Sequence, residues 1–161
     1  MSNKREIVTF EVRDANGTRK LAETIAGSLR GRSACIELVG DVGAGKTTFT
    51  QYLVAGLGSD DHVTSPTFTL ENVYKCSENI VHHFDLYRLQ EAGLIPEEVR
   101  EALEDTASIV IIEWADILHE NSGLPDDRLI LSFELMKDSE SARRITINAS
   151  QGMTFTGEET S

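Results

Sequence analysis

The sequence contains the octapeptide Gly40-Asp41-Val42-Gly43-Ala44-Gly45-Lys46-Thr47, which matches the pattern G-x-x-x-x-G-K-[ST] at every fixed position. Glycines at these positions let the backbone curl around a small anion and direct successive N–H groups at it. The lysine adds a point charge for the outer phosphates of a nucleotide, and the hydroxyl that follows can ligate Mg²⁺. The octapeptide therefore predicts a phosphate-binding loop.

The residues on either side of the octapeptide agree with this interpretation, because the pattern requires a strand before it and a helix after it. Ala34–Val39 is mostly apolar and predicts a strand. Thr47–Ala55 predicts a helix, with Phe49, Leu53 and Leu57 spaced along one face. The helix would add the positive end of its dipole to the anion site.

Length and composition limit the class of protein. The 161 residues suit one domain, which we place at residues 1–150, followed by a polar tail at 151–161 that we expect to be flexible. No apolar run approaches the ~20 residues of a membrane span, and no signal region follows the N-terminus, so we expect a cytosolic protein. A net charge of −12 argues against autonomous binding of nucleic acid. Two cysteines far apart in the sequence form no disulfide or metal pattern.

The pattern along the chain predicts an α/β fold of the phosphate-loop NTPase type. We expect a central, mainly parallel sheet flanked by helices, with antiparallel strands at its edges. The expected strands are Ile7–Val12, Ala34–Val39, Phe68–Tyr74, Ile80–Phe84, Ser108–Trp114, Leu129–Leu135 and Arg143–Ala149. The expected helices begin at Thr18 (as N-cap), Thr47, Leu89 and Ala115, and the last two strands would form a hairpin on the sheet edge.

A polar loop around Pro66 follows the helix of the phosphate loop. Thr67 lies 21 residues after Lys46, where a hydroxyl could detect the γ-phosphate or Mg²⁺. The same residues also suit a Ser/Thr turn that leads into a strand. The spacing alone leaves both interpretations open.

Two acidic residues end expected strands, at the sheet edge where α/β proteins bind ligands. Asp85 ends the strand that contains His82 and His83, although an aspartate there could equally cap a helix. Glu113 ends the most apolar strand, in a place where phosphate-loop proteins often carry an acid that positions a metal. An unpaired glutamate there would be costly, so a metal, a water or an arginine should be close. We interpret the two histidines as structural, because adjacent strand residues face opposite ways.

Four motifs occur in order in this one short chain: G-D-V-G-A-G-K-T-T, S-P-T-F-T, H-F-D-L-Y-R and I-I-E-W. Together they resemble the bacterial TsaE family, formerly called YjeE, over about residues 7 to 150. The resemblance implies an ATPase required for threonylcarbamoyladenosine at position 37 of tRNA. It also implies that the protein works with the TsaB and TsaD proteins, which carry out the transfer, and that it meets tRNA only through that complex.

The resemblance also implies roles for individual residues. Thr47, Glu113 and Asp85 would serve a Mg²⁺ ion, and Lys46, Asp85, Glu113 and Thr67 would be the residues needed for ATP turnover. Thr18 and Arg143 stand where the family also has a threonine and an arginine, and are possible nucleotide contacts only. The remaining expected nucleotide contacts are Asp41, Val42, Gly43, Ala44, Gly45, Lys46, Thr47 and Thr48.

Three other classes of protein fit the phosphate loop less well. A small-molecule kinase needs cations on a lid, and the arginines here are few and scattered. A GTPase would be expected to have an N-K-x-D stretch, which is missing. A nucleotide-gated binding module with incidental hydrolysis stays open and overlaps the ATPase interpretation. Arg88 is the best internal candidate for an arginine finger.

Overall fold

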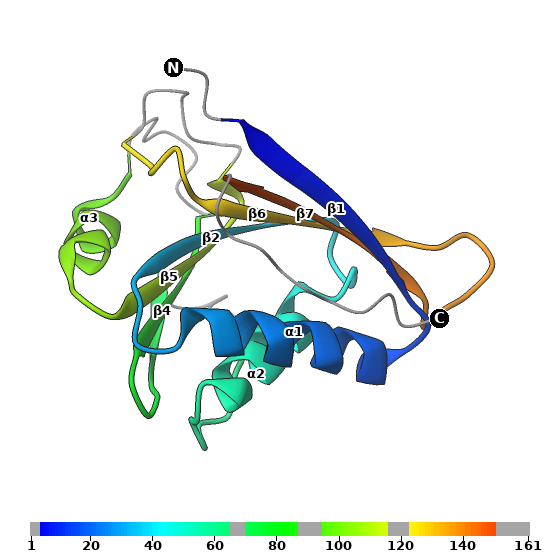
Figure 1. Ribbon diagram of the computed structural model, residues 1–161, viewed down its shortest axis with the longest axis horizontal. Helices are drawn as coiled ribbons and strands as arrows, with labels where there is room; N and C mark the ends of the chain where they lie inside the picture. The colour runs from blue at the N-terminus through cyan, green and yellow to red at the C-terminus, as the bar shows by residue number, and fades with distance from the viewer. Residues whose placement is uncertain (1–3, 65–69, 87–94, 116–122, 151–161) are drawn as a thin grey trace.

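The computed structural model describes residues 4–64, 70–86, 95–115 and 123–150. Within these ranges the chain forms seven strands and three helices, which alternate along the first part of the chain (Figure 1). The elements are β1 (Arg5–Val12), α1 (Ala15–Leu29), β2 (Ala34–Val39), α2 (Lys46–Gly56), β3 (Glu71–Lys75), β4 (Ile80–Asp85), α3 (Glu97–Glu104), β5 (Ser108–Glu113), β6 (Leu129–Leu135) and β7 (Arg143–Ser150).

All seven strands belong to one mixed sheet with the order β1-β7-β6-β2-β5-β4-β3. The four strands β6, β2, β5 and β4 are parallel to one another, whereas β1, β7 and β3 pair antiparallel with their neighbours. The prediction of a mainly parallel sheet was therefore wrong, because half of the strand pairings are antiparallel. The β6–β7 hairpin is not the edge either, since β1 pairs with the free side of β7, from Arg5 opposite Ser150 to Val12 opposite Arg143.

The sheet carries helices on both faces, as Figure 1 shows: α1 and α2 pack on one face and α3 on the other. The central strand β5 is buried along its whole length, and its side chains alternate between the two cores. Ile109 and Ile111 join the core under α1 and α2, and Val110 and Ile112 join the core under α3. Glu113 follows this alternation onto the α2 face.

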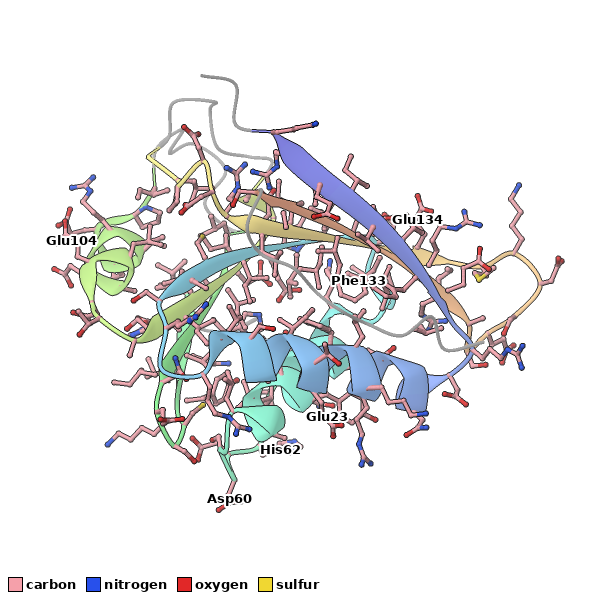
Figure 2. All side chains as sticks on the ribbon, in the orientation of Figure 1. Glu23, Asp60, His62, Glu104, Phe133 and Glu134 are labelled. Atoms are coloured by element: carbon pink, nitrogen blue, oxygen red, sulfur yellow. The ribbon has the colours of Figure 1, made fainter. Side chains whose placement is uncertain are left out.

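Side chains in Figure 2 divide between this interior and the solvent. Phe133 of β6 lies between the sheet and the helices, where its ring meets that of Phe49 edge to face at 5.6 Å between centroids. Glu23 and Glu104 point outward from their helices. The contact between Phe133 and Phe49 ties β6 to the first turn of α2, next to the phosphate loop.

The start of α1 corrects one prediction. The N-cap is Asp14, whose side chain accepts from the N–H of Gly17 at 3.1 Å, and Thr18 lies buried inside the helix. A glycine is typical of a turn, so Gly17 led to the prediction that the helix begins after it. Its place is explained by close packing, because a Cβ on Gly17 would lie 2.9 Å from the Cβ of Val12.

The other predicted elements agree with the structure wherever it describes them. The strand expected from Phe68 begins at Glu71 in the described residues. Of the helix expected from Leu89, the described part begins at Glu97, because Ile95 and Pro96 are described and are not helical. The predictions at Thr67, at Arg88, for most of the helix after Ala115 and for the tail at 151–161 fall outside the described residues.

Both cysteines are free thiols, as the sequence predicts. Burial raises the pKa of the Cys35 thiol to about 12, and partial burial raises that of Cys76 to about 11. Among the described residues, no helix is long and apolar enough to cross a membrane.

The side chain of Asn79 joins the end of α1 to the residue that precedes β5. Its Nδ2 lies within hydrogen-bonding distance of the carbonyl oxygens of Arg32 (2.9 Å), Ala107 (3.1 Å) and Leu29 (3.3 Å). Its Oδ1 accepts from the N–H of Gly31 at 3.0 Å. The side chain is 4% exposed, so these backbone groups have little access to water as a substitute.

We expect Asn79→Ala to lower the free energy of unfolding by about 2–3 kcal/mol, because it leaves several backbone groups without a partner. Urea denaturation would measure the loss. Asn16→Ala, on the exposed face of α1, is the matched control and should change stability by less than about 0.5 kcal/mol. Equal effects of the two substitutions would contradict the role given to Asn79.

Candidate functional site

The predicted phosphate loop connects β2 to α2, as the motif requires. Gly43 (φ +83°) and Gly45 (φ +112°) have backbone conformations that L side chains rarely adopt. Gly45 is the N-cap of α2, and none of the described side chains caps this end of the helix. The first N–H groups of α2 are therefore directed at the space above the loop, where an anion can accept from them.

Two neighbouring strands hold the loop in place. A Cβ on Gly40 would lie 2.8 Å from the carbonyl oxygen of Phe133, so β6 approaches too closely for any other residue. From β7, the Nε of Arg143 donates to the carbonyl oxygen of Ala44 at 3.0 Å. Arg143 thus braces the loop backbone, a role that the family resemblance did not suggest.

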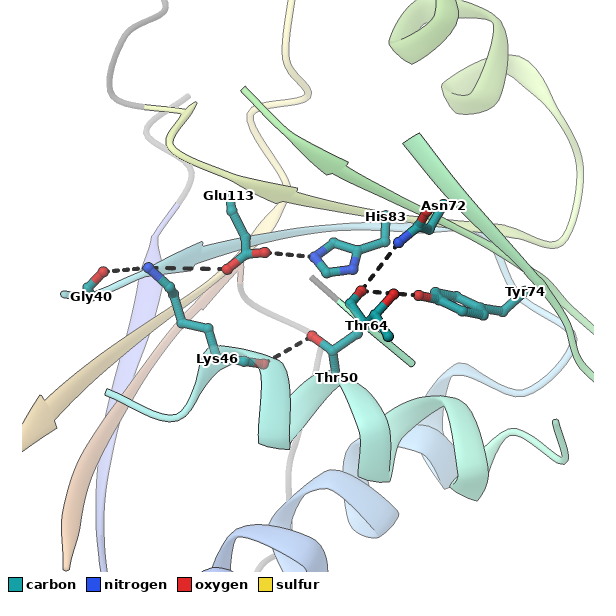
Figure 3. Close-up of polar contacts among 8 residues, drawn as sticks. All are labelled: Gly40, Lys46, Thr50, Thr64, Asn72, Tyr74, His83 and Glu113. Carbon is teal, nitrogen blue, oxygen red and sulfur yellow. Dashed lines mark hydrogen bonds and ion pairs between the residues drawn. The ribbon is translucent and has the colours of Figure 1, made fainter. Parts of the chain in front are cut away.

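Lys46 is buried, with only 8% of its surface exposed. Its Nζ donates to the carbonyl oxygen of Gly40, at the other end of the loop, and lies 4.0 Å from Oε1 of Glu113 (Figure 3). The same ammonium lies 4.8 Å from the centre of the Trp114 ring, within the range of a cation–π contact. The lysine therefore folds back into its own loop.

Glu113 is 4% exposed and has two partners among the described residues. Its Oε2 lies 2.7 Å from Nε2 of His83, within hydrogen-bonding distance, and its Oε1 faces Lys46 (Figure 3). The sequence predicted a metal, a water or an arginine beside this carboxylate; the structure places a histidine and a lysine there. His82 and His83 do face opposite sides of β4, since His82 contacts Glu71 instead.

His83 was not predicted from the sequence as part of the site. A signal was present, because His83 lies two residues before Asp85 and so shares its face of the strand. The signal could be used only once β4 and β5 were known to be parallel neighbours. In that register Asp85 lies directly opposite Glu113.

Asp85 and Glu113 therefore bring two carboxylates side by side at the carboxyl ends of neighbouring parallel strands. Like charges this close repel unless a cation lies nearby. With the Thr47 hydroxyl they form a set of hard oxygen donors, which suits Mg²⁺. Among the described residues there is no group of three or more His, Cys, Asp or Glu that could hold a metal.

These groups surround a cavity of about 620 Å³. Its lining contains nine of the residues that the sequence predicted: Val42, Gly43, Gly45, Lys46, Thr47, Thr48, Asp85, Glu113 and Arg143. Trp114 also lines it. Asp41 and Ala44 line a second cavity of similar volume, between the loop and the β6–β7 hairpin. Thr18 is buried in α1 and lines neither of these two cavities.

Trp114 was not predicted as a site residue, although it is the last residue of the motif I-I-E-W. Its φ of +63° is an outlier for a bulky residue and costs on the order of 1–3 kcal/mol. Such strain persists where the surroundings impose it, and it is frequent at functional sites. Here the conformation places the indole ring beside Lys46 at the mouth of the loop.

The fold and the site define an α/β protein with a phosphate-loop motif whose lysine faces acids at the ends of two parallel strands. The model of the family "Threonylcarbamoyl adenosine biosynthesis protein TsaE" matches residues 12–145. The chain belongs to the TsaE family, as the four motifs predicted.

Individual proteins agree with this assignment. The chain is 33% identical over 132 residues to the tRNA threonylcarbamoyladenosine biosynthesis protein TsaE of Haemophilus influenzae, covering 79% of each chain. It is 35% identical over 117 residues to the protein of the same name from Bacillus subtilis, covering 71% of this chain and 68% of that protein. The crystal structure of Bacillus subtilis YdiB superposes with a TM-score of 0.74 and 26% identity, over 92% of this chain and 89% of that one.

Because Lys46 is buried, its removal should lower the stability of the folded protein as well as its affinity for phosphate. Without the lysine, Glu113 would keep only His83 as a partner among the described residues, in a place that water scarcely reaches. We therefore expect Lys46→Met to destabilise the nucleotide-free protein by about 1–3 kcal/mol. In the double variant with Glu113→Gln most of this loss should disappear, giving a coupling energy of about 1 kcal/mol or more in urea denaturation.

The exposed pair of Arg100 and Glu97, joined at 2.7 Å, is the control. The Arg100–Glu97 distance is shorter than the 4.0 Å between Lys46 and Glu113, so distance alone would predict a larger coupling energy for the exposed pair. Because both side chains are more than half exposed, we expect the matched cycle to give about 0.5 kcal/mol or less. Equal coupling in the two cycles would contradict the importance of burial at Lys46.

Proposed function

We propose that this protein binds and hydrolyses ATP with Mg²⁺ as part of threonylcarbamoyladenosine biosynthesis on tRNA. One observation carries the proposal: the phosphate loop, its lysine and the two strand-end carboxylates line a single cavity. The names of the relatives in Haemophilus influenzae and Bacillus subtilis supply the biological process.

The residues of the cavity divide the work of binding. The N–H groups of the loop would donate hydrogen bonds to the phosphate oxygens, and Lys46 would leave the Gly40 carbonyl to neutralise the outer phosphates. Thr47, Glu113 and Asp85 would hold Mg²⁺, directly or through water, because this ion keeps several waters and few protein ligands. When bound, the ion would neutralise charge on the transferred phosphoryl group.

The site favours slow hydrolysis by the isolated protein. Among the described residues, the only arginine that lines the cavity is Arg143, and its Nε already donates to the loop backbone. Phosphoryl transfer without a cation at the transferred group is slow, and a donated arginine is worth roughly 10³–10⁵ in rate. We therefore propose that TsaB and TsaD stimulate turnover, with Arg88 of this chain as the internal alternative.

A nucleotide-gated binding module is the second candidate function. Its support is the buried Lys46, which must change partners when a nucleotide binds, so occupancy alone could alter the mouth of the loop. The two functions differ in whether the protein releases phosphate over repeated cycles.

We expect Lys46→Met to lower the ATP turnover number by roughly 10²–10³, the range found when one preorganised electrostatic contact is removed. Phosphate release at saturating Mg²⁺ would measure it. Lys20→Met, an exposed lysine of α1, is the control and should keep the parent rate. Turnover of the Lys46 variant at the parent rate would exclude this loop as the hydrolytic site.

We expect the TsaB and TsaD proteins to raise the rate of ATP hydrolysis at least about tenfold, since a partner cation compensates for the missing charge. The isolated protein should not bind tRNA at physiological salt, because a net charge of −12 repels the phosphate backbone. Steady-state phosphate release and tRNA gel shifts would test both statements. Turnover that ignores the partners, or tight tRNA binding by the protein alone, would contradict this arrangement.

A further inference from the structure

His83 is the only histidine among the described residues that is fully buried, and none of the roles proposed above uses it. It lies on β4, one strand away from Glu113, and its Nε2 lies 2.7 Å from Oε2 of that carboxylate. Figure 3 shows the imidazole between the glutamate and the residues around Thr64. The contact is thus an internal part of the site that solvent does not reach.

The register of the two central parallel strands creates this contact. His83 lies opposite Ile111, and Asp85 lies opposite Glu113, so the imidazole meets the carboxylate on a diagonal across two positions. As a result, the two carboxylate oxygens of Glu113 have different partners. Oε2 is held by His83, and Oε1 is left facing Lys46 and the cavity.

The hydrogen-bonding pattern favours one ring nitrogen as the site of the proton. An ionised carboxylate only accepts, so the proton of the contact belongs to Nε2. The other nitrogen, Nδ1, is buried without a hydrogen-bond partner among the described residues. A bare acceptor is tolerated in the interior better than an orphaned N–H, which favours the tautomer with its proton on Nε2.

We propose that His83 is a positioning residue for Glu113. By donating from Nε2 it fixes the carboxylate with Oε1 toward the loop, both before a nucleotide arrives and after Lys46 has left for the phosphates. The inference rests on the proposed function to the extent that Glu113 serves the Mg²⁺–nucleotide complex. A histidine that only filled space would need no particular nitrogen and no particular tautomer.

The first test needs no nucleotide. Nitrogen-15 NMR of labelled, nucleotide-free protein separates protonated from unprotonated ring nitrogens in the four histidines of the chain, and the signals lost in His83→Gln identify His83. We expect Nε2 protonated and Nδ1 unprotonated. A ring protonated on Nδ1 alone would overturn the inference, whatever the protein does with ATP.

The second test uses a matched pair of substitutions. Glutamine places an amide N–H near the position of Nε2, whereas asparagine places it near Nδ1. His83→Asn should therefore raise the Mg²⁺ concentration needed for half-maximal ADP binding by about 10–100-fold, the usual cost of losing a group that orients a metal ligand. His83→Gln should stay within about threefold of the parent protein.

The fluorescence of Trp114, the single tryptophan of the chain, follows this binding from beside Lys46. His82→Gln is the control, since it changes the neighbouring histidine on the opposite face of β4 and should leave the Mg²⁺ dependence unchanged. Equal behaviour of the asparagine and glutamine variants, whether intact or impaired, would refute positioning through Nε2. If the parent protein fails to bind ADP, the proposed function fails, and the NMR result alone decides the inference.

Discussion

The buried carboxylate of Glu113 is the constraint on which the site depends. A charge at the end of a fully buried strand is costly unless donors surround it, and here a histidine and a lysine do so. Each donor comes from a different part of the sheet's α2 face: His83 from the neighbouring strand, Lys46 from the loop that follows β2. The carboxylate thereby links the loop to the two strands that carry the acids, and a change in the register of β4 and β5 would break that link.

The antiparallel half of the sheet contributes to the same site from the other side. The β6–β7 hairpin continues the sheet beyond β2, and β1 pairs with the outer side of β7. This arrangement brings the Phe133 carbonyl against Gly40 and the Arg143 guanidinium against Ala44. The loop is therefore fixed at both ends before any ligand is present, so a phosphate need not order its backbone. Preorganisation of this kind lowers the entropy lost on binding.

The sequence predicted the local features well, because each rests on short-range physical chemistry. The phosphate loop follows from glycines with positive φ, and the central strand from a run of β-branched residues. The pairing of distant strands was harder to predict, because the partner of β1 lies almost at the other end of the described chain. The alternation of side chains along a strand indicates which face is buried, but it does not identify the neighbouring strand. The role of His83 and the burial of Lys46 depend on that pairing, so neither could be predicted from spacing. The mistaken cap at Thr18 had a local cause, since Gly17 imitates a turn where tight packing against Val12 requires a glycine.

The charge balance of the cavity suggests why a metal should accompany the nucleotide. Among the described residues, Lys46 contacts Glu113, and Asp85 lies opposite Glu113 in the register of β4 and β5. A nucleotide that drew Lys46 to its phosphates would leave the acids facing additional negative charge at short range, where the low dielectric of a buried site strengthens repulsion. A divalent cation between the phosphates and the acids would attract both groups and so replace their mutual repulsion with attraction. Under the proposed function, the acids would therefore favour the metal-bound form of the nucleotide over the free form. The proposed role of the histidine contact would then be to keep Glu113 oriented while a metal takes the place of the lysine.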